Sequence, residues 1–203
     1  KNVRVEPFTV TGFVRGAETA ELTAPYPHKL HVTALGYSAP TPKGGLKAEL
    51  VYFPSLDALK AAPEGSLKGK IAFIDHAMTR TQDGSSYGPY GAARRQGPGI
   101  AASKGASGVV IRSIGTAANS RTPHTGMLSY DIAFRRIPGA ALSNPDADLI
   151  EAMLRRGEPV VVELRLGAGI RGEYTSQNVI AEVDGREDSD RFVLIGGHLD
   201  SWD

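Results

Sequence analysis

Residues that could bind a metal ion lie together near the C-terminus, where His198 is followed by Asp200 and Asp203. The apolar run Phe-Val-Leu-Ile at 192–195 precedes them and is typical of a buried strand. Glycines at 196 and 197 separate this run from His198, so the backbone there can approach a ligand closely. An imidazole and carboxylates at the end of a core strand, where the loop opens to solvent, are suited to holding a divalent cation.

The spacing of His198 and Asp200 indicates which role each side chain would have in binding a metal ion. Residues two apart on an extended backbone lie on the same face. A zinc-bound histidine commonly donates its second ring N–H to a carboxylate, which fixes the ring and raises its basicity. Spacing alone does not decide between this role and an ordinary structural contact. Because a zinc centre has at least three protein ligands, we expect this motif to be one part of a centre and the chain to be one part of an enzyme.

Other reactive side chains are better explained without a site. A run at 97–102, Gly-Pro-Gly-Ile-Ala-Ala, resembles a dinucleotide fingerprint, but that fingerprint directly follows a strand, and the preceding predicted strand ends near Asp75. Ser129 and Ser201 could be nucleophiles, yet the sequence has no Gly-x-Ser-x-Gly motif, which disfavours a serine hydrolase. For the other histidines a surface, loop or structural role is favoured: His28, His31, His76 and His124. His124 could also take part in binding.

Composition excludes several classes of protein. The 23 basic and 22 acidic residues leave a formal net charge of +1, too small to indicate nucleic acid or anionic lipid as a partner. The absence of cysteine excludes disulfides, thiolate zinc sites and a cysteine nucleophile. No apolar run approaches the ~20 residues that cross a membrane, and no signal peptide is visible. We therefore expect a globular protein whose partners include neither nucleic acid nor a membrane.

The elements that must position the motif follow from hydrophobic periodicity. Residues 1–36 predict strands, and the run rich in proline and glycine at 38–45 marks a boundary. From about 46 to 166 strands alternate with helices, which predicts a small α/β domain. In that domain we expect strands within 46–53, 70–75, 108–112 and 160–166, and helices at 55–60, 99–106 and 144–156. Strands are expected again from 168, at 177–183 and 192–196.

The clearest helix signal begins at Asn144, which we place at the N-cap. Pro145 then falls in the first turn, and Asp146 and Asp148 lie near the positive end of the helix dipole. Gly157 is expected to end the helix. The sequence therefore predicts a capped amphipathic helix immediately before the last strand of the α/β domain.

Several segments together resemble the M28 family of zinc aminopeptidases and carboxypeptidases. The most specific is 192–203, Phe-Val-Leu-Ile-Gly-Gly-His-Leu-Asp-Ser-Trp-Asp, together with Ser-Gln-Asn-Val-Ile-Ala-Glu-Val-Asp-Gly at 176–185. Residues 2–7 and 14–22 resemble strands that precede an inserted domain in one branch of that family. Residues 111–114, 123–127 and 137–141 resemble the insert itself, the protease-associated (PA) domain.

The resemblance implies a mixed α/β architecture, in which a small PA-type α/β domain is inserted between strands of a truncated zinc-peptidase sheet. Residues 1–40 would be the N-terminal strands of the peptidase domain. Residues 41–167 would form the PA domain, and residues 168–203 would be the returning peptidase strands that end in the His-x-Asp motif.

The resemblance also implies a site and an activity. His198 takes the place of a zinc ligand, and Asp200 that of the residue that orients it. The family site holds two Zn²⁺ ions, and its remaining ligands and general base have no counterpart in this chain. The implied protein is a secreted or periplasmic exopeptidase that cuts short peptides, and a homodimer is left open. We expect the chain alone neither to hydrolyse peptides nor to hold zinc tightly.

The alternative is a stand-alone PA-type module that binds a peptide or a partner protein without catalysis. Strands separated from the rest of a sheet would leave open edges, which pair readily with other chains. The sequence therefore also predicts more association than a complete peptidase domain would show.

Overall fold

The computed structural model describes residues 2–129, 135–186 and 191–200. The chain divides into two compact units. One, here called the ribbon unit, comprises residues 1–12 and 171–203, and the other, the core unit, comprises residues 13–170. Within the described ranges no helix has both the length and the apolar character needed to span a membrane.

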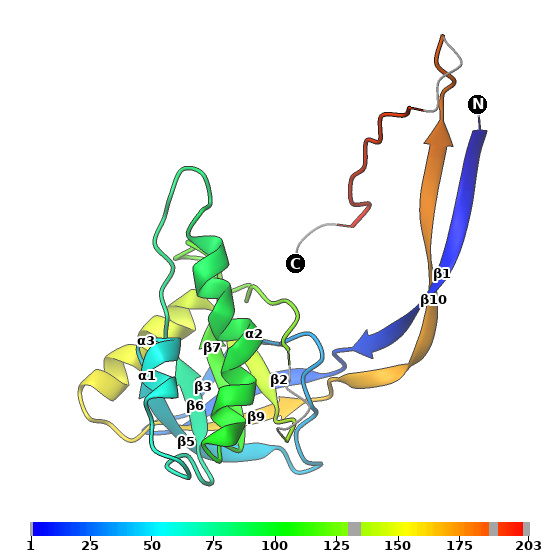
Figure 1. The fold of residues 1–203 in the computed structure, drawn as a ribbon. Coiled ribbons are helices and arrows are strands. Elements are labelled where there is room, and N and C mark those ends of the chain that lie inside the picture. Colours follow the sequence, from blue (N-terminus) through cyan, green and yellow to red (C-terminus); the bar gives the residue numbers. More distant parts are fainter. Residues whose placement is uncertain (1, 130–134, 187–190, 201–203) are drawn as a thin grey trace. The chain divides into compact units, whose positions relative to one another are not determined.

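The core unit is built on an eight-stranded sheet in the order β3-β2-β9-β5-β6-β7-β8-β4 (Figure 1). The four strands from β5 to β8 are parallel, whereas β2, β3, β4 and β9 join the sheet through antiparallel pairing. The strands are β2 (Glu18–Ala24), β3 (His28–Leu30), β4 (Val32–Ala34), β5 (Leu46–Phe53), β6 (Ile71–Ile74), β7 (Gly108–Arg112), β8 (Gly139–Leu142) and β9 (Val161–Leu166).

Helices cover both faces of the parallel strands. One face packs against α1 (Leu56–Lys60) and α2 (Tyr87–Ser103), and the other against α3 (Asn144–Arg155). Each parallel strand therefore sends apolar side chains both ways: in β6, Phe73 packs on the α3 side and Ile74 on the α2 side. Strands buried on both faces read as continuous apolar runs, which is why β6 and β7 could be predicted from the sequence.

The predicted mixed α/β architecture is confirmed, and most of the elements lie where they were expected. Ser55 caps α1 by accepting a hydrogen bond from the Ala58 N–H at 3.1 Å. The N-cap of α3 is Ser143 rather than Asn144, because the Ser143 hydroxyl accepts from the Asp146 N–H three residues on. Asn144 is consequently the first residue of the helix, which begins one residue earlier than predicted.

The helix predicted at 99–106 is present as the end of a longer helix, α2, which begins twelve residues earlier, at Tyr87, and ends at Ser103. Glycine and proline disfavour a helix, which hides the first part of α2 in the sequence. Several of its glycine and alanine residues and Pro98 are nevertheless buried. A Cβ at Gly97 would lie 2.5 Å from the Cδ1 atom of Ile74. Gly97 thus lets the helix lie close to the strands, and this packing outweighs the low helix propensity of glycine.

Within residues 1–36, where strands were expected, the extended segment at 28–34 is divided in two at His31. On its N-terminal side β3 pairs with β2, and on its C-terminal side β4 pairs with β8, at the opposite edge of the sheet. The backbone N–H of His31 donates to the Asp146 carboxylate at 2.6 Å instead of to a strand. This side-chain acceptor lets the chain leave one edge and enter the other without an unsatisfied donor.

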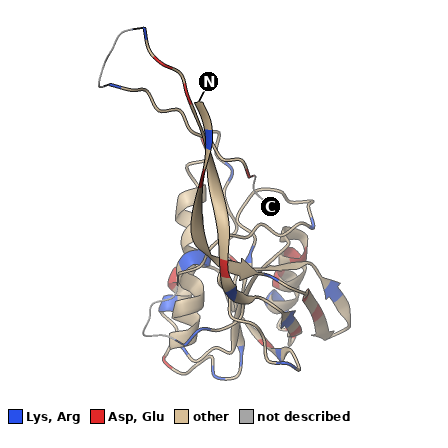
Figure 2. Ribbon diagram, turned by 90° about the vertical axis from the view of Figure 1, so that its right-hand side faces the viewer, with Lys and Arg blue, Asp and Glu red and all other residues tan. Residues whose placement is uncertain are grey.

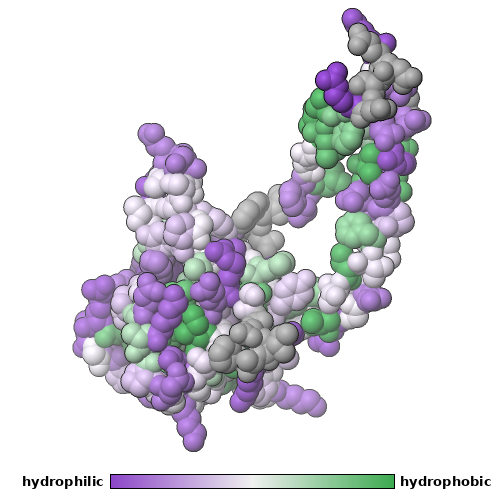
Figure 3. Space-filling view, viewed as in Figure 1, coloured by the Kyte–Doolittle hydropathy of each residue, from purple (hydrophilic) through white to green (hydrophobic). Residues whose placement is uncertain are grey.

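In the ribbon unit, most of β1 (Asn2–Val14) and β10 (Gly169–Glu182) form a two-stranded antiparallel sheet. Arg4 of β1 pairs with Glu182 of β10 at 2.9 Å. The two strands carry few charged residues (Figure 2), and apolar side chains are exposed along them (Figure 3). Opposite Gly12, the ring of Tyr174 lies where a Cβ would be, so only glycine fits there without moving the ring.

The predicted strand at 192–196 was wrong. The side chains of residues 192–195 are 84–90% exposed, and the described part of the chain gives them no strand neighbour. A strand is stable only when its backbone groups pair with a neighbour, and apolar character by itself supplies none. The strand expected at 177–183 is present as the end of β10.

The structural division differs from the boundaries expected at 40/41 and 167/168. On the N-terminal side it falls at 12/13, because β2 pairs with β9 from Glu18 to Ala24, which ties these early residues to the core unit. On the C-terminal side it falls at 170/171.

Candidate functional site

His198 and Asp200 lie side by side in the ribbon unit. The Nδ1 atom of His198 is 3.1 Å from Oδ1 of Asp200, and both side chains are exposed. The hydrogen bond to His198 lowers the pKa of the Asp200 carboxyl. The carboxylate therefore meets the imidazole in the way expected of a residue that orients a metal ligand.

The geometry leaves Nε2 of His198 as the ring nitrogen that a metal ion would take. A neutral imidazole nitrogen is an ordinary zinc donor, so the residue fits that group chemically. Among the described residues there is no cluster of three or more histidine, aspartate or glutamate side chains that could hold a metal. Asp203 and Ser201, which the sequence also singled out, lie outside the described residues.

The other histidines of the chain make contacts within the core unit. The ring of His76 packs on Tyr90 with centroids 4.2 Å apart. His124 Nε2 is 2.8 Å from the hydroxyl of Tyr87. His28 lies in β3, and the ring of His31 contacts Asp146. Ser129 is exposed, with its backbone N–H donated to the carbonyl of Arg95.

A second polar cluster, which sequence reasoning missed, surrounds the guanidinium of Arg112 at the end of β7. Arg112 is 7% exposed, and its Nε donates to Oδ1 of Asp75 at 2.5 Å. Its Nη1 donates to Asp148 at 2.5 Å and its Nη2 to Glu151 at 3.3 Å. The only sequence signal is a charged residue at the end of an apolar strand, next to Asp75 at the end of the preceding predicted strand.

Burial and charge act against each other in this cluster. Burial raises the pKa of the Asp75 carboxyl, although the hydrogen bond from Arg112 opposes the rise. Burial opposes the charge of Arg112, but hydrogen bonds to Asp75 and Asp148 outweigh it and raise the pKa of the guanidinium. The pKa of Tyr52 is also raised, chiefly by burial.

Asp146 forms a third cluster at the N-terminus of α3. Its side chain is 1% exposed and accepts from the N–H of His31 at 2.6 Å and from the hydroxyl of Ser143 at 2.7 Å. Arg121 donates to its other oxygen at 2.7 Å. Burial opposes the carboxylate, but the hydrogen bonds from His31 and Ser143 outweigh burial and lower the pKa of Asp146. The residue predicted as a helix-dipole partner is therefore a buried junction between three segments.

Comparisons with known proteins agree with the resemblance read from the sequence. The chain is 34% identical to carboxypeptidase Q of Bos taurus over 204 residues, and 32% identical to that of Homo sapiens over 203. A solved structure of a peptidase M28 precursor from Shewanella amazonensis SB2B matches all of the chain at 52% identity with a TM-score of 0.94. An aminopeptidase from Aneurinibacillus sp. strain AM-1 matches 88% of the chain at 22% identity and a TM-score of 0.56, which supports the fold alone. No family model matches.

The resemblance to the M28 peptidases is thus confirmed over the whole chain. The match is partial in the other direction: the chain spans 41% of the length of each of these two carboxypeptidase Q sequences and 46% of the Shewanella protein.

Proposed function

We propose that this chain is the PA domain and the adjoining strands of an M28-type zinc exopeptidase that hydrolyses short peptides. The observation that carries the proposal is the His198–Asp200 pair, in which a carboxylate orients an exposed imidazole. Its support is the relationship to peptidases across the full sequence.

In this proposal His198 is one ligand of a two-zinc centre, and Asp200 is the residue that positions it. Asp200 holds the imidazole through Nδ1 and so keeps Nε2 directed at the metal. The Asp200 carboxylate, whose pKa the hydrogen bond to His198 lowers, is charged at neutral pH, and this charge raises the basicity of the ring. When bound, the metal pair would lower the pKa of a water molecule and polarise the scissile carbonyl.

The core unit, residues 13–170, is proposed as the inserted PA domain. Its role would be non-catalytic: to cover the active site of the complete enzyme or to mediate association, with a homodimer as one form. The proposed compartment is extracellular or periplasmic, as the precursor status of the Shewanella relative suggests. The 203-residue chain by itself is proposed to be inactive, because one histidine falls short of the three ligands that a catalytic zinc needs.

Kinetics of the polypeptide encoded by the complete reading frame test this function. With unblocked dipeptides as substrates, Asp200→Asn should lower kcat/KM by about 10–100-fold, as expected for a residue that orients a metal ligand. His198→Ala should lower kcat/KM further than Asp200→Asn does. Added zinc should restore part of the activity of Asp200→Asn.

The matched control is Asp184→Asn, which removes an exposed carboxylate from the same unit and should leave kcat/KM unchanged. Equal activity of the His198→Ala protein and the wild type would overturn the proposal. Peptide binding without hydrolysis by the complete protein would favour the alternative, a PA-type interaction module.

A further inference from the structure

A cleft of about 300 Å³ lies in the core unit, at the carboxyl ends of the parallel strands β6 and β7. Its walls come from the loop after β6, at 77–80, and the loop after β7, at 115–118. Arg112, Asn144 and Asp148 complete the lining. Ligands of open α/β sheets bind outside the carboxyl ends of their strands, so the position alone makes this cleft a candidate.

A cluster of carboxylates and cations lies beneath the cleft. The Arg112 guanidinium contacts three carboxylates, those of Asp75, Asp148 and Glu151. A second cation, Arg155, pairs with Glu151 at 2.6 Å. Three carboxylates thus contact two cations in this cluster. Of the three carboxylates, Asp148 is the most exposed and is the one that lines the cleft, so a ligand there can reach it.

Two acceptors stand at the start of α3, one exposed and one buried at the wall of the cleft. Asp148 is an exposed carboxylate whose Oδ1 is already occupied by Arg112, which leaves one oxygen for a ligand. Asn144 is 8% exposed, and its Nδ2 donates to the carbonyls of Gly115 and Ala117, both at 3.4 Å. Those contacts fix the amide, and its Oδ1 has no hydrogen-bond donor in the part of the chain that the structure describes. A buried acceptor without a donor is costly.

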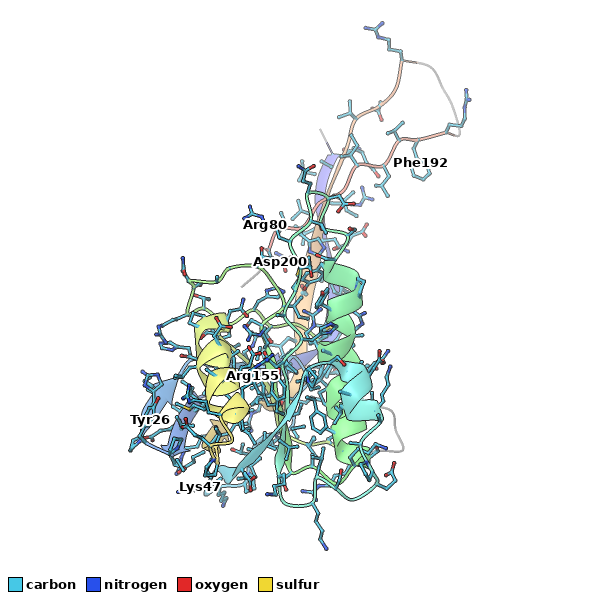
Figure 4. All side chains as sticks on the ribbon, turned by 90° about the vertical axis from the view of Figure 1, so that its left-hand side faces the viewer. Tyr26, Lys47, Arg80, Arg155, Phe192 and Asp200 are labelled. Atoms are coloured by element: carbon cyan, nitrogen blue, oxygen red, sulfur yellow. The ribbon has the colours of Figure 1, made fainter. Side chains whose placement is uncertain are left out.

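We propose that this cleft binds the terminal ammonium group of a short peptide. An ammonium presents three donors around a point charge, whereas a guanidinium prefers both oxygens of one carboxylate. Since Asp148 offers a single oxygen, the ammonium is the better match. Arg80, exposed on the loop that follows β6 (Figure 4), lines the same cleft and can meet the carboxylate of a dipeptide. This binding does not depend on peptidase activity.

Titration of the 203-residue chain by ¹H–¹⁵N NMR at pH 7 tests the inference. Alanyl-alanine is the probe, because its α-ammonium is largely protonated at this pH. Its N-acetyl derivative, which lacks that charge, is the control ligand. We expect saturable shifts of the amides at 77–80, 115–118 and 148, with a Kd of about 1 mM, and no such shifts with the acetylated peptide.

The variant Asp148→Asn should weaken binding of alanyl-alanine at least tenfold, about 1.4 kcal/mol. Asp57→Asn, which removes an exposed carboxylate from α1, should bind as the wild type does. The proposal is overturned by equal shifts from both peptides, by an unchanged Kd in Asp148→Asn, or by no shift at about 50 mM ligand, roughly fifty times the expected Kd. The comparison of the two peptides uses the wild type, so it holds whatever Asp148→Asn does to the fold.

Discussion

At the scale of single residues, Asp146 links more of the chain than any motif in the sequence suggested. Its carboxylate accepts from the segment between β3 and β4, from the N-cap of α3 and from Arg121. Hydrogen bonds to a charged acceptor contribute about 1.5–3 kcal/mol each when a partner is removed. We expect Asp146→Asn to lower the free energy of unfolding by about 2–3 kcal/mol, measured by urea denaturation at pH 7. Asp57→Asn, at an exposed site, should change it by less than about 0.5 kcal/mol.

The same residue gives a pH dependence with a definite sign. Its native pKa lies below the ordinary value of 3.8, so the native state holds this proton less tightly than the unfolded state does. The stabilisation is therefore complete above that ordinary value and is lost as the pH falls through the lowered native pKa. The difference in unfolding free energy between wild type and Asp146→Asn should shrink on going from pH 7 to pH 2. A constant difference across that range would contradict this role.

Arg112 should be essential for stability in a different way. Removal of one partner from a buried ion pair costs about 3–5 kcal/mol, because the other charge is left uncompensated. Arg112→Met leaves the Asp75 carboxylate buried and should be destabilised by that amount, whereas the double variant Arg112→Met, Asp75→Asn should recover part of the loss. Arg165→Met removes an exposed ion pair and serves as the control in thermal and urea unfolding. No recovery in the double variant would show that the cost does not come from the unpaired carboxylate.

At the scale of elements, α2 shows where the sequence was misleading. The helix contains Gly88 and Gly97, but only Gly97 is packed against the sheet. A Cβ at Gly88 meets nothing within 4 Å, so Gly88→Ala should stabilise the protein by about 0.5–1 kcal/mol through helix propensity. Gly97→Ala makes the same change beside the buried side chain of Ile74, and should leave the protein at least about 1 kcal/mol less stable than Gly88→Ala. Equal unfolding free energies would contradict the packing explanation for these glycines.

The elements divide into those that local signals specify and those that depend on partners. Strands β6 and β7 could be predicted from their apolar runs, and α1 from Ser55 as its cap. The start of α2 could not, because glycine is a poor helix former and the contact of Gly97 with Ile74 is not visible in the sequence. The run at 192–195 has the composition of a buried strand, yet its side chains are exposed. Whether this run forms a strand depends on a neighbouring strand to pair with, which its amino-acid composition cannot reveal.

The candidate sites follow the same division. His198 and Asp200 could be predicted because they are two residues apart, and their contact is local. The Arg112 cluster could not, since Asp75 and Glu151 meet that guanidinium from segments 37 and 39 residues away. Such clusters depend on strand order and on the placement of α3, which the sequence pattern alone does not give.

At the scale of the whole molecule, the chain matches relatives more than twice its own length. The ribbon unit exposes apolar side chains from β1, β10 and residues 192–195. Large exposed apolar areas mark surfaces that pack against other protein, which fits the proposal that these strands belong to a peptidase domain. The core unit, by contrast, encloses its apolar clusters with its own helices and sheet.

The most direct test of the proposed function is zinc-edge anomalous diffraction from crystals of the complete polypeptide grown with zinc. We predict an anomalous peak about 2.0–2.1 Å from Nε2 of His198, with Asp200 still hydrogen-bonded to Nδ1. A well-ordered imidazole packed among apolar side chains, with no anomalous peak in reach of either ring nitrogen, would contradict it.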